Sequence, residues 1–143
     1  MKKILILLTV LALFLSVAVA EEGTDTFQWG EYGKVQLTQL TEWNDEITYQ
    51  VDGSPEGKWI VAVFSIQDGG NFTADAMNLA DDVLKLDEYT AKKKAAKGAT
   101  IDIASGTITL TGTMAFIFDV PVDYDLSQGV LTVNGEKAVV PAA

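Results

Sequence analysis

The stretch Lys58-Trp59-Ile60-Val61-Ala62-Val63-Phe64-Ser65-Ile66 decides the fold class of this chain. Successive side chains of a strand point to opposite faces, so Trp59, Val61 and Val63 would share one face and the even-numbered apolar residues the other. A strand that is apolar on both faces lies in the interior of a structure, covered from two sides. Turn-forming clusters at 52–57 and 68–71 bound the stretch. The pattern therefore predicts a central β-strand.

Alternating apolar and polar residues predict further strands on both sides of this centre. The expected strands are 34–40, 47–51, one from about 83, one around 100–103, 107–111, 114–120, and the two arms of a hairpin at 130–133 and 137–140. Asn134-Gly135 is a strong hairpin signal, and Gly112 indicates a bulge or a close backbone approach. One short helix is expected near 74–81. The sum predicts an all-β, immunoglobulin-like antiparallel sandwich of about seven or eight strands, with a closed barrel as the alternative.

The N-terminus has the layout of a secretory signal peptide. Lys2 and Lys3 are followed by the uncharged residues 4–20, which end in the small-x-small pattern Ala18-Val19-Ala20. We expect cleavage after Ala20 and an extracellular protein; an uncleaved anchor helix is the competing interpretation. The absence of cysteine at the cleavage point argues against a lipid anchor. The expected organisation is a signal peptide (1–20), a polar N-terminal segment (21–33) and one sandwich domain (34–143).

The amino-acid composition excludes several kinds of catalytic and binding group. The chain has 143 residues without cysteine, histidine or arginine, which excludes thiol nucleophiles, imidazole bases and guanidinium forks. Cleavage would leave 8 Lys against 20 Asp and Glu, a net charge of −12. Such a domain repels nucleic acid and anionic membranes, so we expect neither as a partner and expect a monomer.

Two motifs resemble a family of bacterial secreted and surface immunoglobulin-like domains. They are 57–63 (Gly-Lys-Trp-Ile-Val-Ala-Val) and 110–121 (Leu-Thr-Gly-Thr-Met-Ala-Phe-Ile-Phe-Asp-Val-Pro), and Leu131-Thr132-Val133 agrees with the closing hairpin. The mycobacterial secreted immunoprotective antigen belongs to the same superfamily. The resemblance implies an extracellular β-sandwich of unknown biochemical role and supplies no catalytic residues.

Three groups of residues are candidate binding features. The acidic loop with Asp119, Asp123 and Asp125 offers oxygen ligands for calcium, but it lacks the EF-hand spacing, so solvated acids are the preferred interpretation. The lysines of 92–97 indicate a protected edge strand, or else a site for an anionic partner. Exposed aromatics could stack on sugars, whereas buried ones would cover the core; this group consists of Phe27, Trp29, Tyr32 and Trp43.

These features favour a non-enzymatic extracellular interaction domain whose partner is another protein or a cell-surface polymer. The alternative is a small carbohydrate-binding module that uses Trp29, Tyr32 and Trp43. A carboxylate-dependent hydrolase is a distant third, because no motif selects one pair among 20 acidic residues. The sequence assigns no catalytic residue, no cofactor and no metal ligand.

Overall fold

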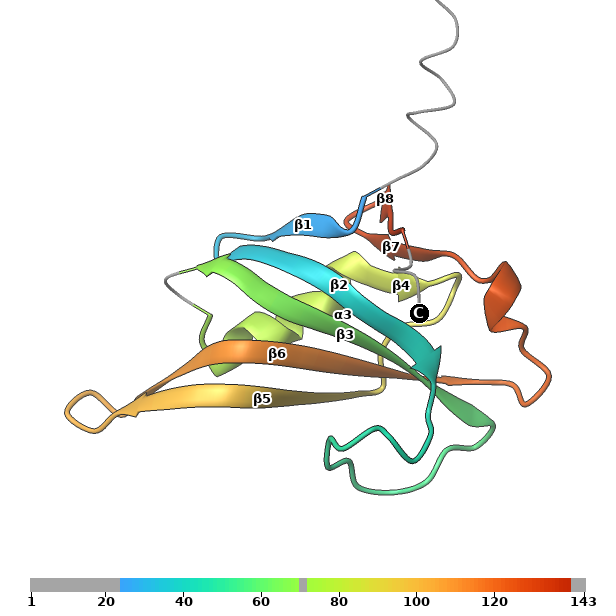
Figure 1. Cartoon of the computed structure of the whole chain (residues 1–143), viewed down its shortest axis with the longest axis horizontal. Coiled ribbons are helices and arrows are strands. Elements are labelled where there is room, and N and C mark those ends of the chain that lie inside the picture. The colour runs from blue at the N-terminus through green and yellow to red at the C-terminus, as the bar shows by residue number, and fades with distance from the viewer. Residues whose placement is uncertain (1–23, 70–71, 140–143) are drawn as a thin grey trace, which may run out of the picture.

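The computed structural model describes residues 24–69 and 72–139, and the predicted signal peptide lies outside these residues. Within these residues, eight strands in two antiparallel sheets confirm the predicted all-β sandwich (Figure 1). The larger sheet has the order β1 (Thr26–Trp29), β2 (Gly33–Glu42), β3 (Lys58–Gly69), β6 (Thr107–Val120) and β5 (Lys93–Asp102). The smaller sheet has the order β4 (Leu84–Leu86), β7 (Leu131–Val133) and β8 (Glu136–Lys137). No helix in the described residues has the length and apolar character needed to cross a membrane.

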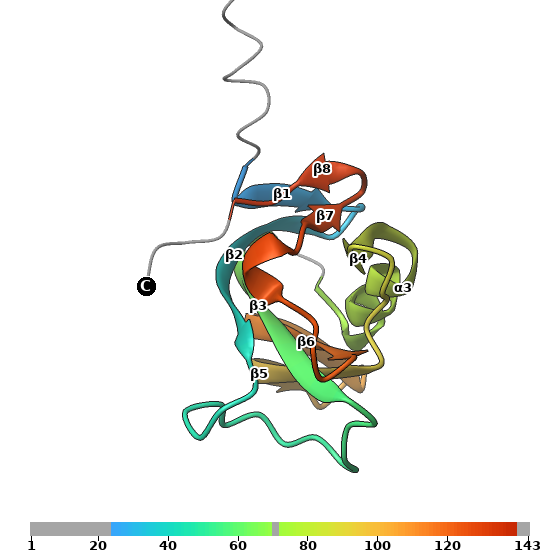
Figure 2. The ribbon, with the colours of Figure 1, turned by 90° about the vertical axis from the view of Figure 1, so that its right-hand side faces the viewer.

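The helical part of the described chain is short and forms part of the second layer. A 3₁₀ helix, η1 (Ala74–Leu79), continues into α3 (Ala80–Val83), which confirms the predicted helix near 74–81. A second 3₁₀ turn, η2 (Leu126–Gln128), precedes β7. Figure 2 shows α3, β4 and β7 on one side of the larger sheet. These elements cover the face of β3 and β6 that we call inner.

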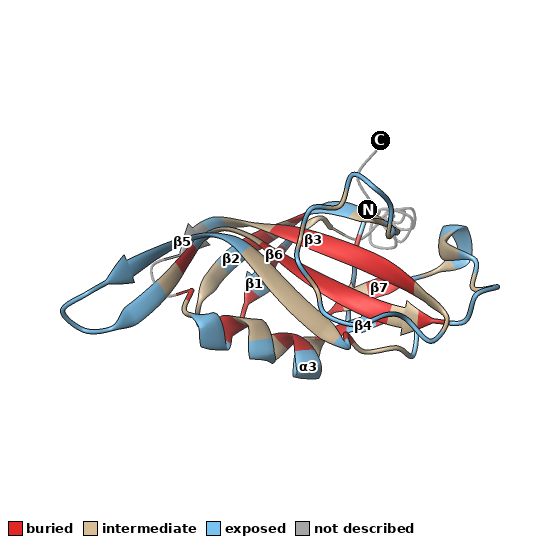
Figure 3. Cartoon of the chain, turned by 90° about the horizontal axis from the view of Figure 1, so that it is seen from below, coloured by how far each residue is buried: buried red, intermediate tan, exposed pale blue. Residues whose placement is uncertain are grey.

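The central strand is covered on both faces, as the sequence predicts. On the inner face, Trp29 stacks on Phe116 with ring centroids 5.5 Å apart and lies 5.7 Å from Phe64. The largest fully buried side chains of this inner cluster are Trp29, Phe64, Phe72, Phe116 and Phe118. The opposite face holds a smaller outer cluster, which consists of Trp59, Val61, Val63, Ala115 and Ile117. The strands of the centre appear as the buried part of the sheet in Figure 3.

The expected strand at 47–51 is wrong, because this segment belongs to the loop between β2 and β3 and pairs with no strand. Its alternation has another cause. Ile47, Tyr49 and Val51 are half-buried and pack against the outer cluster. One side of an extended segment can therefore be apolar without forming a hydrogen-bonded ladder.

The segment 21–33, expected to be a polar addition before the domain, contributes to the sheet within its described part. β1 pairs with β2 in antiparallel register, with Phe27 opposite Val35. Phe27 and Trp29 alternate with exposed neighbours and are buried in the inner cluster. The strand is thus a two-faced edge strand whose apolar face helps to close the core.

Two glycine predictions agree with the backbone. β6 runs unbroken through Gly112, and its register against β5 shifts by one residue beside it, as expected for a bulge. A Cβ on Gly112 would overlap the carbonyl group of Lys97, so the close approach requires glycine. The hairpin between β7 and β8 turns at Asn134 and Gly135 with φ of 52° and 84°, and this pair of positive values is typical of a type I′ turn.

Candidate functional site

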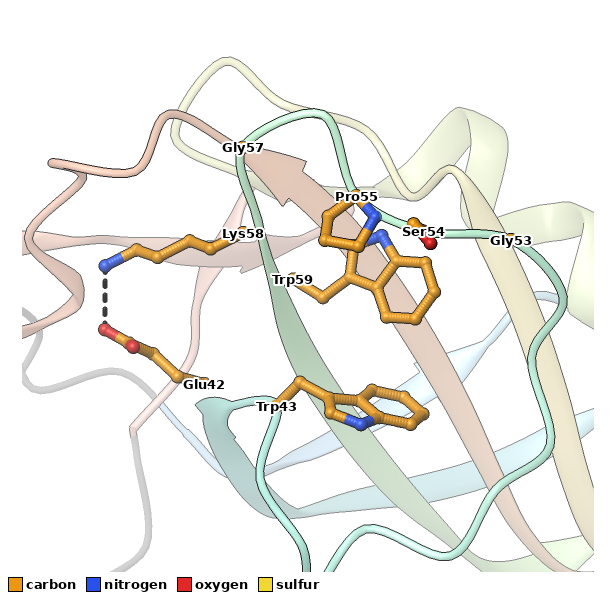
Figure 4. Close-up of a pocket in the computed structure, with 8 residues that line it drawn as sticks. All are labelled: Glu42, Trp43, Gly53, Ser54, Pro55, Gly57, Lys58 and Trp59. Atoms are coloured by element: carbon orange, nitrogen blue, oxygen red, sulfur yellow. Dashed lines mark hydrogen bonds and ion pairs between the residues drawn. The ribbon is translucent and has the colours of Figure 1, made fainter.

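An open pocket lies where β2 leaves the sheet and β3 enters it (Figure 4). We call it the tryptophan notch. Its volume is about 380 Å³, within the range of small-ligand sites. It is lined by Glu42, Trp43, Gly53, Ser54, Pro55, Gly57, Lys58 and Trp59.

Two indole rings form the apolar part of the notch. The backbone N–H of Trp43 donates to the carbonyl oxygen of Trp59 at 2.9 Å, which continues the pairing of β2 with β3 by one residue. This bond places the two side chains on the same face, and their rings meet edge-to-face with centroids 5.2 Å apart at 66°. Trp59 is only 8% exposed, whereas Trp43 is half-buried. Trp43 is therefore the indole that a ligand can reach.

The opposite wall is a turn held in place by a carboxylate of β6. Asp119 accepts hydrogen bonds from the backbone N–H groups of Glu56 at 2.8 Å and Gly57 at 3.0 Å. Gly57 lies so close to the carbonyl group of Val120 that a Cβ atom would overlap it. In Figure 4 the turn brings Pro55 beside the ring of Trp59.

The charged residues of the notch neutralise each other. Lys58 Nζ and Glu42 Oε2 form an ion pair at 2.8 Å. In Figure 4 these side chains lie on the other side of the two strands from the indoles. The pair therefore joins the ends of β2 and β3, and the indole side of the notch presents aromatic rings, a proline ring, the Ser54 hydroxyl and backbone groups.

The aromatic residues selected from sequence separate into two kinds. Trp29 is fully buried, and its Nε1–H donates to the Ala76 carbonyl oxygen at 2.7 Å, so it cannot stack on a sugar. Phe27 is buried as well, and half-buried Tyr32 packs 5.9 Å from Phe72. Trp43 alone of this group lines the notch. The second wall, Trp59, was expected in the core and was missed as part of a site.

The three aspartates of the acidic loop have separate positions. Asp119 holds the turn of the notch, while the Asp125 carboxylate caps η2 by accepting from the Ser127 N–H at 3.0 Å. Asp123 is exposed. Among the described residues, no three acidic side chains gather in a geometry that would hold a metal ion.

The lysines of 92–97 lie on or beside β5, at the edge of the larger sheet, as the edge-strand interpretation predicts. Lys94 forms an ion pair with Asp81 of α3 at 3.0 Å. Lys97 Nζ donates to the Thr48 hydroxyl and lies 4.5 Å from the centre of the Tyr49 ring. The lysine side chains of this segment therefore point to both faces of the sheet.

Two titratable groups away from the notch have shifted pKa values. Burial and a hydrogen bond to Asp87 raise the pKa of Tyr124 above its ordinary value. Hydrogen bonds from Gln36 and Thr26 lower the pKa of Asp25. The notch offers aromatic rings for stacking and polar groups for hydrogen bonding.

Comparison of the chain with protein-family models, curated proteins and solved structures finds no match.

Proposed function

We propose that this chain is a secreted, non-enzymatic binding domain that holds a neutral saccharide in the tryptophan notch. The observation that carries the proposal is the half-buried Trp43, set edge-on against Trp59 in an open pocket of about 380 Å³. Aromatic faces bind the apolar face of a sugar ring, and nearby polar groups bind its hydroxyls. The predicted signal peptide and the resemblance to secreted immunoglobulin-like domains support the extracellular location.

Charge favours a neutral ligand. The chain without residues 1–20 carries a net charge of −12, which repels anionic polymers. Glu42 and Lys58 are paired with each other, so they leave no net charge beside the indoles. The Ser54 hydroxyl and the backbone of the 53–57 turn supply hydrogen-bonding groups for an uncharged ligand.

A glycan array probed with residues 21–143 tests the proposal, followed by titration of the best ligand. We expect Trp43→Ala to abolish binding, because it removes the accessible ring. The matched control is Tyr32→Ala, which truncates another half-buried aromatic residue outside the notch and should leave affinity unchanged. Equal losses in both variants, or no neutral glycan bound, would contradict the proposal.

Fluorescence locates the ligand independently. The chain has three tryptophans, and Trp29 and Trp59 are buried while Trp43 is half-buried. Acrylamide should therefore quench mainly Trp43, and the saccharide should protect it. Protection that persists in Trp43→Ala would place the ligand elsewhere.

A further inference from the structure

The free edge of β5 is a second surface that contributes no residue to the lining of the tryptophan notch, although the Lys93 side chain reaches toward Gly53. β5 is the last strand of the larger sheet, and on its far side it pairs with no other strand among the described residues. It is ten residues long, and its second half is exposed (Figure 3). Every other backbone N–H and C=O of an edge strand points away from the sheet, where another strand can pair with it.

β5 lacks most of the devices that block such pairing. It has no proline, and the extra residue of the bulge belongs to β6, because Lys97 and Ala99 face Thr113 and Leu110. The side chains between Lys94 and Lys97 are small, namely Ala95 and Ala96. Gly98 has φ of 82°, so the regular extended edge that can pair with another strand is 93–97. The remaining protection is the positive charge of its lysines, which repels another basic strand but attracts an acidic one.

The charge of this edge is opposite to that of the molecule. Four of the 8 lysines that follow residue 20 are Lys92, Lys93, Lys94 and Lys97. Within the described residues Lys94 is the one member of this group in an ion pair, with Asp81. Lys97 contacts the neutral Thr48 and Tyr49. Asp102, at the far end of β5, is the acidic residue of the strand itself.

A pocket of about 420 Å³ opens between this strand and the β2–β3 loop. It is lined by Thr48, Tyr49, Gln50 and residues 94–97. Two of its lining groups are the Lys97 ammonium, which is cationic, and the aromatic ring of Tyr49, with Nζ 4.5 Å from the ring centre. A strand that pairs with β5 would direct alternate side chains toward this side of the sheet, where the pocket can receive one.

From these observations we propose that the β5 edge docks an extended acidic peptide segment of a partner protein by adding it to the sheet as a further strand. Backbone hydrogen bonds supply the pairing, and the lysines that hold no ion pair select acidic side chains. Lys93 and Lys97 lie on one face of β5 and make the selection, whereas Lys94 lies on the other face and is paired with Asp81. The proposal does not rest on the saccharide site, although Lys93 lies close to Gly53 of the notch.

A labelled peptide of alternating Glu and Thr tests it by fluorescence anisotropy on residues 21–143. We expect saturable binding that weakens with salt, and none for the Lys-Thr peptide. Lys93→Glu with Lys97→Glu should reduce affinity by about tenfold or more. The control is Lys34→Glu with Lys137→Glu, two exposed lysines elsewhere, which changes the net charge equally and should have little effect.

Amide hydrogen exchange measured by NMR separates strand addition from charge attraction. Bound peptide should protect alternate amides of β5, and an acidic peptide with a central proline should bind weakly because proline cannot donate to the ladder. No binding, equal losses in the two double variants, or binding without β5 protection would each overturn the proposal. Protection of β5 that rises with protein concentration in the absence of peptide would also overturn it, since the occupant would then be a second copy.

Discussion

The two faces of the β3–β6 pair carry apolar clusters that are covered in different ways. The inner cluster lies under η1, α3, β4 and β7, which are regular elements with their own hydrogen bonds. The outer cluster lies under the 43–57 loop, which forms no ladder. Val61 and Ile117 of the outer cluster are nevertheless fully buried. Equal burial is thus reached under a cover of regular elements on one face and under a loop on the other.

This difference explains where a ligand can reach an aromatic ring. The loop packs Ile47, Tyr49 and Val51 on the outer cluster and is hydrogen-bonded to the sheet at four points. These are the Trp43–Trp59 backbone bond, the Lys97 bond to the Thr48 hydroxyl, the Tyr49 hydroxyl on the Thr113 hydroxyl, and the Asp119 carboxylate on the turn. Between these points the cover leaves open pockets at the notch and beside Tyr49. Few contacts and exposed backbone are the features of segments that open locally at low cost. The tryptophan notch and the pocket beside Tyr49 both lie along this cover.

The largest expected effect comes from two matched truncations, Ile60→Ala and Ile117→Ala. Both isoleucines are fully buried, one in the inner and one in the outer cluster. Isoleucine-to-alanine changes in cores cost roughly 2–5 kcal/mol, and the cost falls where the surroundings can collapse into the cavity. We expect about 4 kcal/mol for Ile60→Ala and about 2 kcal/mol for Ile117→Ala, measured by urea unfolding.

The slope of the urea transition is the control for this pair. An unchanged m-value in both variants would show that each change acts on the stability of the same folded state. Equal losses of stability in Ile60→Ala and Ile117→Ala would contradict the expected difference between the faces, since the loop would then be as rigid a cover as the second layer.

The fold was largely predictable because its decisive signals are local. The two-sided apolar stretch of β3, the Asn134-Gly135 turn and the short helix near 74–81 each lie within a few residues of sequence. The segment 47–51 shows the limit. Alternation reports that one side of a segment is buried, but it does not report whether the backbone finds a neighbouring strand to pair with.

The notch was less predictable because its parts meet only through tertiary contacts. Trp29 and Trp43 have similar polar surroundings in sequence, yet one is the centre of the core and the other borders a pocket. The role of Asp119 depends on its register opposite Trp59, which brings it beneath the 56–57 turn. One feature of the sequence could have indicated the notch: Trp43 and Trp59 stand at the two ends of the same loop.

The second prediction concerns the anchor of the loop. Asp119→Ala removes the acceptor of two backbone N–H groups, so we expect a loss of about 1–3 kcal/mol in the free energy of unfolding. Saccharide affinity should fall as well, because the turn that carries Pro55 is released. Asp123→Ala, at an exposed position of the same acidic loop, is the control and should change stability by less than about 0.5 kcal/mol. If the two variants behave alike, Asp119 does not hold the turn.

The smallest expected effect is a loss of folding stability at alkaline pH caused by Tyr124, on the inner side of the sheet. Tyr124 packs against the inner cluster and donates to Asp87 Oδ2 at 2.5 Å, and burial followed by this hydrogen bond raises its pKa. A phenol with a raised folded-state pKa contributes stability that is complete below its unfolded pKa, near 10, and is lost as the pH rises above it. Urea unfolding from neutral pH to above pH 10 should therefore show a steeper loss for the unmodified chain than for Tyr124→Phe, which cannot ionise. Because lysines titrate in the same range, the difference between the two proteins isolates Tyr124. If the free energy of unfolding falls equally steeply with pH in both proteins, the Tyr124 phenol is not held by the inner side as the structure indicates. The comparison of the two faces would then lose its support at this residue.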